Sequence, residues 1–589
     1  MPQNNSPHDF YIPVMGTGFT IDSPLFVAKY GISSVISLVD DVLIEQMRKF
    51  WCEKSGEPYE PINSQDKDAR AKRITAYLNL MQKIIDQQIA DIKASPFEPN
   101  SEITRYFEML PKNQLKQKYS DMLVEHDSAK KLNLQEQLRQ AVTVGSIDVN
   151  IMTKLDCQNY YNGEALPYEF NDAAAALRGY ANSDLDSTVV FSAGFNPHLY
   201  GYISEFNDFY PDANGYIKKK ICLKVSDYRS AAVQGKYLAK RGLWVSEYRI
   251  ESALNCGGHA FINDGQLLGP ILAEFKQYKN ELIETLHGFY KGALEKIKKL
   301  CPANPQKVKI TAQGGVGTSV EHELLIKHYD ADAVGWGTPF LLVPGATSVD
   351  VPTLDKLINA QEKDVFLSAS SPLGIPFWNL KNSESEEARC ERIKNGAPGS
   401  FCAKGYLKFN QEFTKKPICR ASREYQKLKL QELESSNLPS EQLNAIKEDM
   451  LSKACICHEL GGGVLIKDNI DTKIKSAICP GPNLINFKKI ATLKEMIDHI
   501  YGRCSLIANN ERPHVFIREI QLQINHLLNE MKNASAGLPA RSQQKLAEVK
   551  QTLSEGIEYY KKSARELFQE QQNKCLLSLQ ELQDELPLL

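Results

Sequence analysis

The pattern of apolar and polar positions predicts short buried strands that alternate with helices. Several runs rich in β-branched residues are continuously apolar, as in parallel strands covered on both faces, and helical segments separate them. We expect an α/β fold, a (β/α)8 TIM barrel. The eight predicted strands are IPVMG from residue 12, SVISLV from 34, SIDVNIM from 146, STVVFSAG from 187, KKICLKVS from 219, LWVSEYRIESAL from 243, VKITAQGG from 308 and ADAVGWGT from 331.

Helical patterns outside these strands divide the chain further. Apolar residues recur every three or four positions from Ile74 to Ile89 and again from Ile517 to Met531. We expect the tail to pack on the body or on a second copy of the chain. The predicted regions are the first part of the barrel (1–60), a helical insertion (61–142), the remainder of the barrel (143–380), a cysteine-rich module (381–505) and a helical tail (506–589).

Composition excludes some classes of partner. The 589 residues carry a net charge of -2 with 24% charged residues. The surface as a whole therefore lacks the excess of positive charge that would attract nucleic acid or an anionic membrane. No stretch approaches the roughly 18 apolar residues of a membrane span, and no basic segment precedes an apolar run at the start. We expect a cytoplasmic protein.

Glycines recur where the predicted strands end, the rim at which barrels carry their active sites. The last two loops of a barrel often hold a phosphate with backbone N–H groups at a helix start, and AQGGVGTSVEHELL supplies such a turn. We therefore predict a phosphate site at Gly314, Gly315, Gly337 and Thr338.

Two ionisable residues at this rim are candidate catalytic groups. His259 follows Gly257-Gly258 after the sixth strand, where an imidazole can bond a ligand or relay a proton; the alternative is a histidine bonded to a buried carbonyl. Lys224 ends the fifth strand and either faces the ligand or pairs with Asp227. Cys256 is either a reactive thiol or a small packing residue.

These motifs carry a resemblance. GGH after the sixth strand, AQGG after the seventh, ADAVGWGT at the eighth and the opening PVMGTGF resemble the nitronate monooxygenase (2-nitropropane dioxygenase-like) family of FMN-dependent barrels. The layout after residue 345 is more similar to the trans-acting enoyl reductases of polyunsaturated fatty acid and polyketide synthases.

The resemblance implies a position for each part of the cofactor. FMN would lie with its ring near Met15, Gly16 and Gly258 and its phosphate on the glycines of the last two loops, with His259 beside the flavin. Lys224 would stabilise the reduced flavin. Asn255-Cys256 departs from the acidic-small pair that often precedes GGH, which leaves the substrate class open.

The cysteine-rich module suggests a metal. In a reducing compartment clustered cysteines favour metal binding or catalysis over disulfides. Cys402, Cys419, Cys457 and Cys479 stand at separate turns, so an iron-sulfur cluster, a zinc ion or unligated packing thiols are all open readings, and His458 could replace one ligand. Cys455 forms a C-x-C pair with Cys457.

The function expected from these features is that of an FMN-dependent oxidoreductase, resembling a nitronate monooxygenase or an enoyl reductase. It would act on a small organic or acyl-thioester substrate, with a possible iron-sulfur cluster. One alternative is a glutamate-synthase-like enzyme that passes electrons from FMN through a cluster to an electron-carrier protein. The other is a non-catalytic barrel with a zinc-stapled assembly module, and the tail could support a homo-oligomer.

Overall fold

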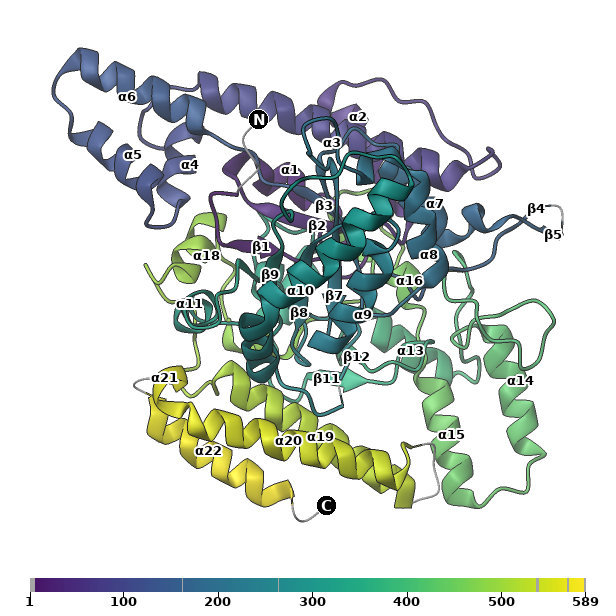
Figure 1. The fold of residues 1–589 in the computed structure, drawn as a ribbon. Coiled ribbons are helices and arrows are strands. Elements are labelled where there is room, and N and C mark those ends of the chain that lie inside the picture. Colours follow the sequence, from purple (N-terminus) through teal and green to yellow (C-terminus); the bar gives the residue numbers. More distant parts are fainter. Residues whose placement is uncertain (1–5, 162, 263, 536–539, 569–570, 587–589) are drawn as a thin grey trace.

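The computed structural model describes residues 6–161, 163–262, 264–535, 540–568 and 571–586, and its centre is a closed barrel of eight parallel strands (Figure 1). Around the barrel the order is β1-β10-β9-β8-β7-β6-β3-β2, which confirms the predicted fold class. The strands are β1 Phe10–Ile12, β2 Ser33–Ser37, β3 Ile147–Ile151, β6 Ser187–Phe191, β7 Lys219–Val225, β8 Val245–Glu251, β9 Lys309–Gln313 and β10 Ala333–Gly335.

All eight strands fall where the apolar runs predicted them, and the first differs in its bounds. We expected it from residue 12, whereas β1 ends there, because Pro13 has no N–H to continue the ladder. β1 pairs with β10 and with β2, so the first and last strands of the barrel close it directly.

Helices surround the barrel, and polar side chains cap the first turns of α8, α9, α11 and α12. The Asp227 carboxylate accepts the N–H of Ser230 at α9, and the Thr318 hydroxyl accepts the N–H of Glu321 at α11. The surrounding helices are α1 Ser23–Val27, α7 Asp172–Ala181, α8 Pro197–Tyr202, α9 Tyr228–Ala239, α10 Leu268–Lys296, α11 Ser319–Lys327 and α12 Val351–Asn359.

The segment between β2 and β3 is helical, as the spacing predicts. Its long helix α3 buries Ile74, Leu78, Met81 and Ile85, and it packs against α2 and α7. The helices are α2 Asp41–Ser55, α3 Ala69–Ala94, α4 Glu102–Met109, α5 Gln114–Val124 and α6 Ser128–Ala141.

The hairpin of β11 and β12, together with the cysteine-rich region that follows it, folds over the mouth of the barrel. Both contact the loop after β8, since His259 bridges to Phe377 of the hairpin and Gly257 bridges to Pro480 of the cysteine-rich region. The elements are β11 Val365–Ser368, β12 Phe377–Leu380, α13 Glu384–Lys394, α14 Arg423–Glu434, α15 Ser440–Ser452, α16 Ile456–Glu459, α17 Gly462–Lys467 and α18 Leu493–Ile500. Helices α14 and α15 extend away from the body as a pair (Figure 1).

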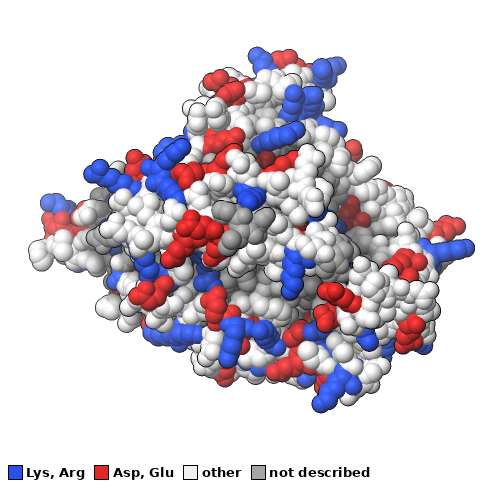
Figure 2. All heavy atoms as spheres, turned by 90° about the horizontal axis from the view of Figure 1, so that it is seen from below, with Lys and Arg blue, Asp and Glu red and all other residues white. Residues whose placement is uncertain are grey.

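The tail forms a bundle of helices along one side of the molecule (Figure 1): α19 Val515–Ser535, α20 Gln543–Lys562, α21 Ala564–Phe568 and α22 Gln572–Glu585. It packs on the body of its own chain, one of the two arrangements expected, with Ile520 and Ile524 buried. The face in Figure 2 carries acidic and basic side chains interspersed. None of the described helices is long and apolar enough to cross a membrane.

A buried carboxylate joins this tail to the barrel. Glu519 of α19 is 1% exposed and accepts the backbone N–H groups of Ala253 (3.0 Å) and Leu268 (2.9 Å). Leu268 opens the 29-residue helix α10, whose N-cap residue Leu267 makes no side-chain cap. Glu519 therefore caps α10 from a distant part of the chain.

Replacing Glu519 tests this contact. Glu519→Ala leaves two buried N–H groups without an acceptor, so the free energy of unfolding should fall by about 2–4 kcal/mol, measured by denaturant titration. Glu519→Gln keeps one acceptor oxygen and should cost less. Glu511→Ala is the control, because Glu511 is exposed and pairs with Lys574 at the surface; an equal loss in both alanine variants would contradict the capping role.

Candidate active site

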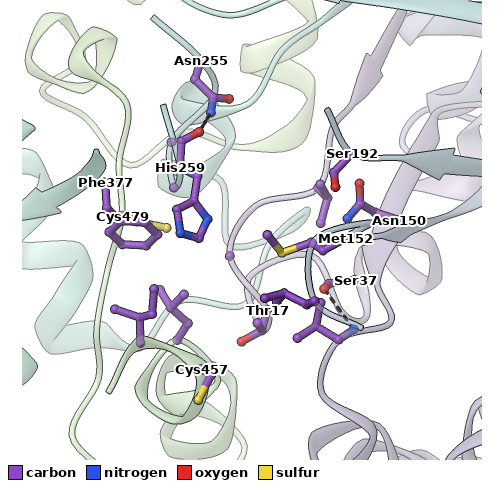
Figure 3. Close-up of a pocket in the computed structure, with 18 of the residues that line it drawn as sticks. Thr17, Ser37, Asn150, Met152, Ser192, Asn255, His259, Phe377, Cys457 and Cys479 are labelled. Atoms are coloured by element: carbon purple, nitrogen blue, oxygen red, sulfur yellow. Dashed lines mark hydrogen bonds between the residues drawn. The ribbon is translucent and has the colours of Figure 1, made fainter. Parts of the chain in front are cut away.

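A cavity opens at the C-terminal ends of the strands, the face at which (β/α)8 barrels carry their active sites. Its barrel side is formed by the residues that close strands β1, β2, β3, β6 and β7, together with the loop after β8 (Figure 3). The lining residues on this side are Val14, Gly16, Thr17, Ser37, Val39, Asn150, Met152, Leu155, Ser192, Lys224, Asn255, Gly257, Gly258, His259 and Phe261.

The rest of the wall comes from the C-terminal region. None of the described residues that line the cavity lies on β9 or β10 or in the loops that follow these strands. In their place stand Phe377, Leu407, Ile456, Cys457, Leu460 and Cys479. The cavity thus has a side with several polar residues, made by the strand ends, and a largely apolar side made by the hairpin of β11 and β12 and the cysteine-rich region.

His259 reaches into the cavity from the loop after β8 (Figure 3). Asn255 has φ +58°, and its side chain accepts the N–H of Cys256 and donates to the His259 carbonyl, which shapes the glycine turn. The ring packs edge-on against Phe377, with centroids 5.0 Å apart, and Nε2 lies 2.7 Å from Ser371 Oγ. That bond holds the ring in place.

Burial, assisted by the nearby Lys154 and Lys224, lowers the pKa of His259 to about 4. The imidazole is therefore neutral near pH 7. In this form it can donate or accept a hydrogen bond at the ligand, whereas an imidazolium acid is disfavoured.

Lys224 also lines the cavity, and its ion-pair partner is Glu251, not the Asp227 considered from the sequence. Its Nζ lies 2.9 Å from Glu251 Oε2, and Gln313 Nε2 donates to the other oxygen of Glu251 at 2.6 Å. Asp227 instead caps α9. A buried ion pair thus holds the Lys224 ammonium at the floor of the cavity.

Two buried polar atoms on the barrel side lack a partner. Asn150 Oδ1 and Thr17 Oγ1 have no hydrogen-bond partner among the described residues, although both residues are at least nine-tenths buried. An unpaired buried polar atom costs about 1–3 kcal/mol, and a ligand in the cavity would remove that cost.

The four predicted phosphate ligands lie beside this cavity, off its described wall. Gly314 and Gly315 have positive φ, and Leu254 lies so close to Gly315 that a Cβ there would meet its Cδ1 at 2.4 Å. A Cβ at Gly337 would meet Cys256 at 2.6 Å, and Thr338 Oγ1 accepts the N–H of Gly481. Their role as phosphate ligands stays a prediction.

Cys256 and Met15 also have packing roles. The Cys256 side chain fills the space above Gly337, and burial raises its pKa to about 12, so it fits the packing reading better than that of a reactive thiol. Met15 is buried and off the described wall, beside Gly16, which is on it.

The predicted metal ligands are divided between two places. Cys402, Cys419 and Cys457 line a second, smaller cavity together with Cys455. Cys479 stands apart from it, in the wall of the barrel cavity (Figure 3). Among the described residues, no group of three or more His, Cys, Asp or Glu side chains is arranged to hold a metal ion.

Sequence reasoning missed Ser371 and Phe377. They lie more than 110 residues beyond His259, in the stretch SPLGIPFWNL, whose resemblance to enoyl reductases assigned neither residue a role. The contact of β12 with the glycine loop brings them to the ring.

Comparisons with known proteins identify no family for this chain. No protein-family model and no curated protein matches the chain. Among solved structures, FabK from Thermotoga maritima is 13% identical over 69% of this chain and 85% of its own, with a TM-score of 0.32. The enoyl reductase domain of MlnA from the macrolactin biosynthesis cluster of Bacillus amyloliquefaciens is 13% identical over 90% and 96%, with a TM-score of 0.37.

A nitroalkane oxidase from Streptomyces ansochromogenes is 9% identical over 64% of this chain and 85% of its own, with a TM-score of 0.29. Likeness at this level carries no functional argument. The function must therefore be inferred from the site itself.

The lowered pKa of His259 predicts a pH effect on stability. Because the unfolded imidazole takes up a proton near pH 6.5 and the folded one only near pH 4, stability should be complete above pH 6.5 and fall as the pH drops through this interval. We expect His259 to account for up to about 2 kcal/mol of the loss between pH 7 and 5.

His259→Gln should therefore show a smaller loss of unfolding free energy over that interval than the parent. His8 and His514, whose pKa values burial also lowers to about 4, should still contribute to the loss of unfolding free energy that remains in this variant. The exposed His198 provides the control variant His198→Gln, and a parent-like pH dependence in His259→Gln would contradict the neutral buried ring.

Proposed function

We propose that this chain is an FMN-dependent oxidoreductase that transfers hydride between flavin and an acyl-thioester or other small organic substrate. The observation that carries the proposal is the pair of unpartnered polar atoms, Asn150 Oδ1 and Thr17 Oγ1, on the strand-end side of the cavity. They supply an acceptor and a hydroxyl at the depth where a flat polar ring would lie.

The donor set fits a flavin ring. Gly258 leaves room for a flat ring at the wall, Met152 adds apolar surface, and Lys224 brings a positive charge to the cavity. An ammonium beside the pyrimidine edge stabilises the negative charge of reduced flavin. We place the FMN phosphate toward the loops of Gly315 and Gly337, as the motif resemblance implies.

FMN, when bound, would supply hydride or single-electron chemistry. The chain's own part is to hold and orient the reactants. Ser371 fixes the ring of His259, and Phe377 packs against it from the side away from the strands. The neutral imidazole then offers a hydrogen bond to an oxygen of the substrate, such as a thioester carbonyl, and polarises it.

The apolar side of the cavity favours an acyl substrate. Leu407, Ile456 and Leu460 line it opposite the strand ends and exclude water from the space over the ring position. A nitronate would use the polar side alone and leave this surface without a role. We therefore favour an enoyl thioester reductase over a nitronate oxidase.

The proposal predicts a yellow protein. FMN should co-purify with the full chain, be released by denaturation, and return on titration with a visible absorption change. Asn150→Ala should weaken FMN binding by about tenfold, because it removes one hydrogen bond of about 1.4 kcal/mol. Asn182→Ala, at an exposed position, is the matched control. A chain that takes up no FMN would overturn the proposal.

His259 should act on turnover more than on cofactor binding. After chemical reduction of the bound flavin, mixing with a short 2-enoyl thioester should reoxidise it, and His259→Ala should slow this step by about 100-fold or more with FMN content unchanged. Ser371→Ala should slow it less, because the imidazole remains but is no longer held.

Ser370→Ala is the control for the Ser371 variant, since Ser370 is equally buried and bonds Ser368 instead. If a nitronate reoxidised the reduced flavin and the thioester did not, the enoyl thioester would be wrong as the substrate class and a nitronate would take its place. If the His259→Ala variant reoxidised its flavin at the parent's rate, His259 would have no role in the reaction.

A further inference from the structure

A lysine stands at the outer edge of the barrel cavity. Lys154 follows β3, and Met152 and Leu155, on either side of it in the chain, both line the cavity. Its Nζ lies 4.5 Å from the centre of the Phe261 ring, which is also part of the wall. Lys154 as a whole is exposed, so its ammonium lies where the cavity meets solvent.

A glycine makes room for the stem of this lysine. Gly194, in the loop after β6, has φ +132°, and a Cβ there would meet Lys154 Cε at 2.9 Å. The two loops are also joined by hydrogen bonds. The Thr153 N–H donates to Ser192 Oγ (3.0 Å), and Asn196 Nδ2 donates to the Thr153 carbonyl (3.1 Å). The stem therefore lies along a fixed stretch of bare backbone.

The carboxylates in this part of the chain are engaged elsewhere. Asp156 accepts the N–H of Ala173 at the start of α7 (3.1 Å), and Glu251 pairs with Lys224. Partial burial lowers the pKa of Lys154, and no described acidic group offsets the effect. An ammonium that is partly removed from water without a counter-charge favours the binding of an anion.

The place of Lys154 decides which part of a ligand it meets. Phe261 contacts both its ammonium and the His259 ring, with 6.3 Å between the two ring centres. His259 is the group that faces the reacting carbonyl, and Lys154 stands further out, at the exposed edge of the same wall. An anion bound by Lys154 therefore belongs to the part of the ligand that leaves the cavity.

We propose that Lys154 binds the phosphate of a pantetheine arm that carries the acyl thioester, and so selects carrier-bound substrates. This inference rests on the proposed function, since it takes an acyl thioester as the substrate. The acyl end reaches His259, the arm passes Phe261, and the phosphate, at the far end of the arm, meets the ammonium. Lys154 acts on substrate affinity and takes no part in the chemical step.

Two thioesters that differ only in the phosphate test this role. The chemically reduced flavin is reoxidised with the same 2-enoyl group on phosphopantetheine and on pantetheine. In Lys154→Met, which keeps an apolar stem, KM for the phosphopantetheine thioester should rise about tenfold with kcat unchanged. KM for the pantetheine thioester should stay within about twofold of the parent's. Lys154→Arg should keep most of the parent's preference for the phosphate.

Lys236 offers a matched control. Its Nζ lies 4.7 Å from the centre of the Phe289 ring, and the residue is exposed on α9, off the wall of the cavity. Lys236→Met thus removes a similar contact of a cation with a ring and should leave both KM values unchanged. The parent's preference for the phosphopantetheine thioester should also weaken as salt is added, and Lys154→Met should lose this salt dependence.

A nicotinamide dinucleotide also carries phosphate, so flavin reduction by NADH is measured in the same variants. If Lys154→Met slowed this reduction and left both thioesters unaffected, the phosphate would belong to the hydride donor and the assignment to the thioester arm would be wrong. Equal changes in KM for the two thioesters, or none, would overturn the proposal. If neither thioester reoxidised the parent's flavin, the proposed function itself would fail.

Discussion

The position of the loop that carries His259 depends on one buried carboxylate. Glu519 binds the N–H groups at both ends of the segment from Ala253 to Leu268, so a residue of the tail fixes the two points between which the glycine turn runs. Burial raises the pKa of this carboxyl, which is the electrostatic cost of the arrangement. The hydrogen bonds offset that cost, and they make the site and the tail a single structural unit.

A second buried carboxylate makes similar contacts to the next loop of the barrel, the glycine turn after β9. Glu321 accepts the N–H groups of Gly317 and Val515 and pairs with Arg512 at 2.6 Å. Arg512 in turn donates to the Gly315 carbonyl and to Asn483. The glycine turn after β9 is therefore held by the chain's own polar groups, which explains why it packs tightly without lining the described cavity.

The sequence predicted the fold better than the site. Buried parallel strands appear as continuous apolar runs, so all eight could be located, and the strand ends then placed Gly16, Lys224 and His259 at the right rim. The glycines of the last two loops were harder to interpret. A glycine that admits a ligand and one that admits a neighbouring side chain look alike in sequence, and at Gly337 the structure has Cys256 in that space.

The cysteines show the same limit. Spacing showed that the thiols gather in one region, yet choosing among them needs the path of the chain. Cys479 lies where the backbone crosses the glycine loop, while Cys455 lies two residues before Cys457 at the start of α16. Ser371 belongs to the stretch SPLGIPFWNL, but the sequence assigned it no role, because its role depends on the His259 ring that it contacts only in the folded chain.

The division of the cavity wall between strand ends and C-terminal region has a consequence for how the protein is made. As the chain leaves the ribosome, all eight strands are available by about residue 335, but Leu407, Cys457 and Leu460 follow roughly 70 to 125 residues later, and Glu519 later still. Until then the barrel mouth is open to water on its apolar side. Assembly of a competent site is therefore among the last events of synthesis, and any cofactor would be enclosed by the C-terminal region as it folds into place.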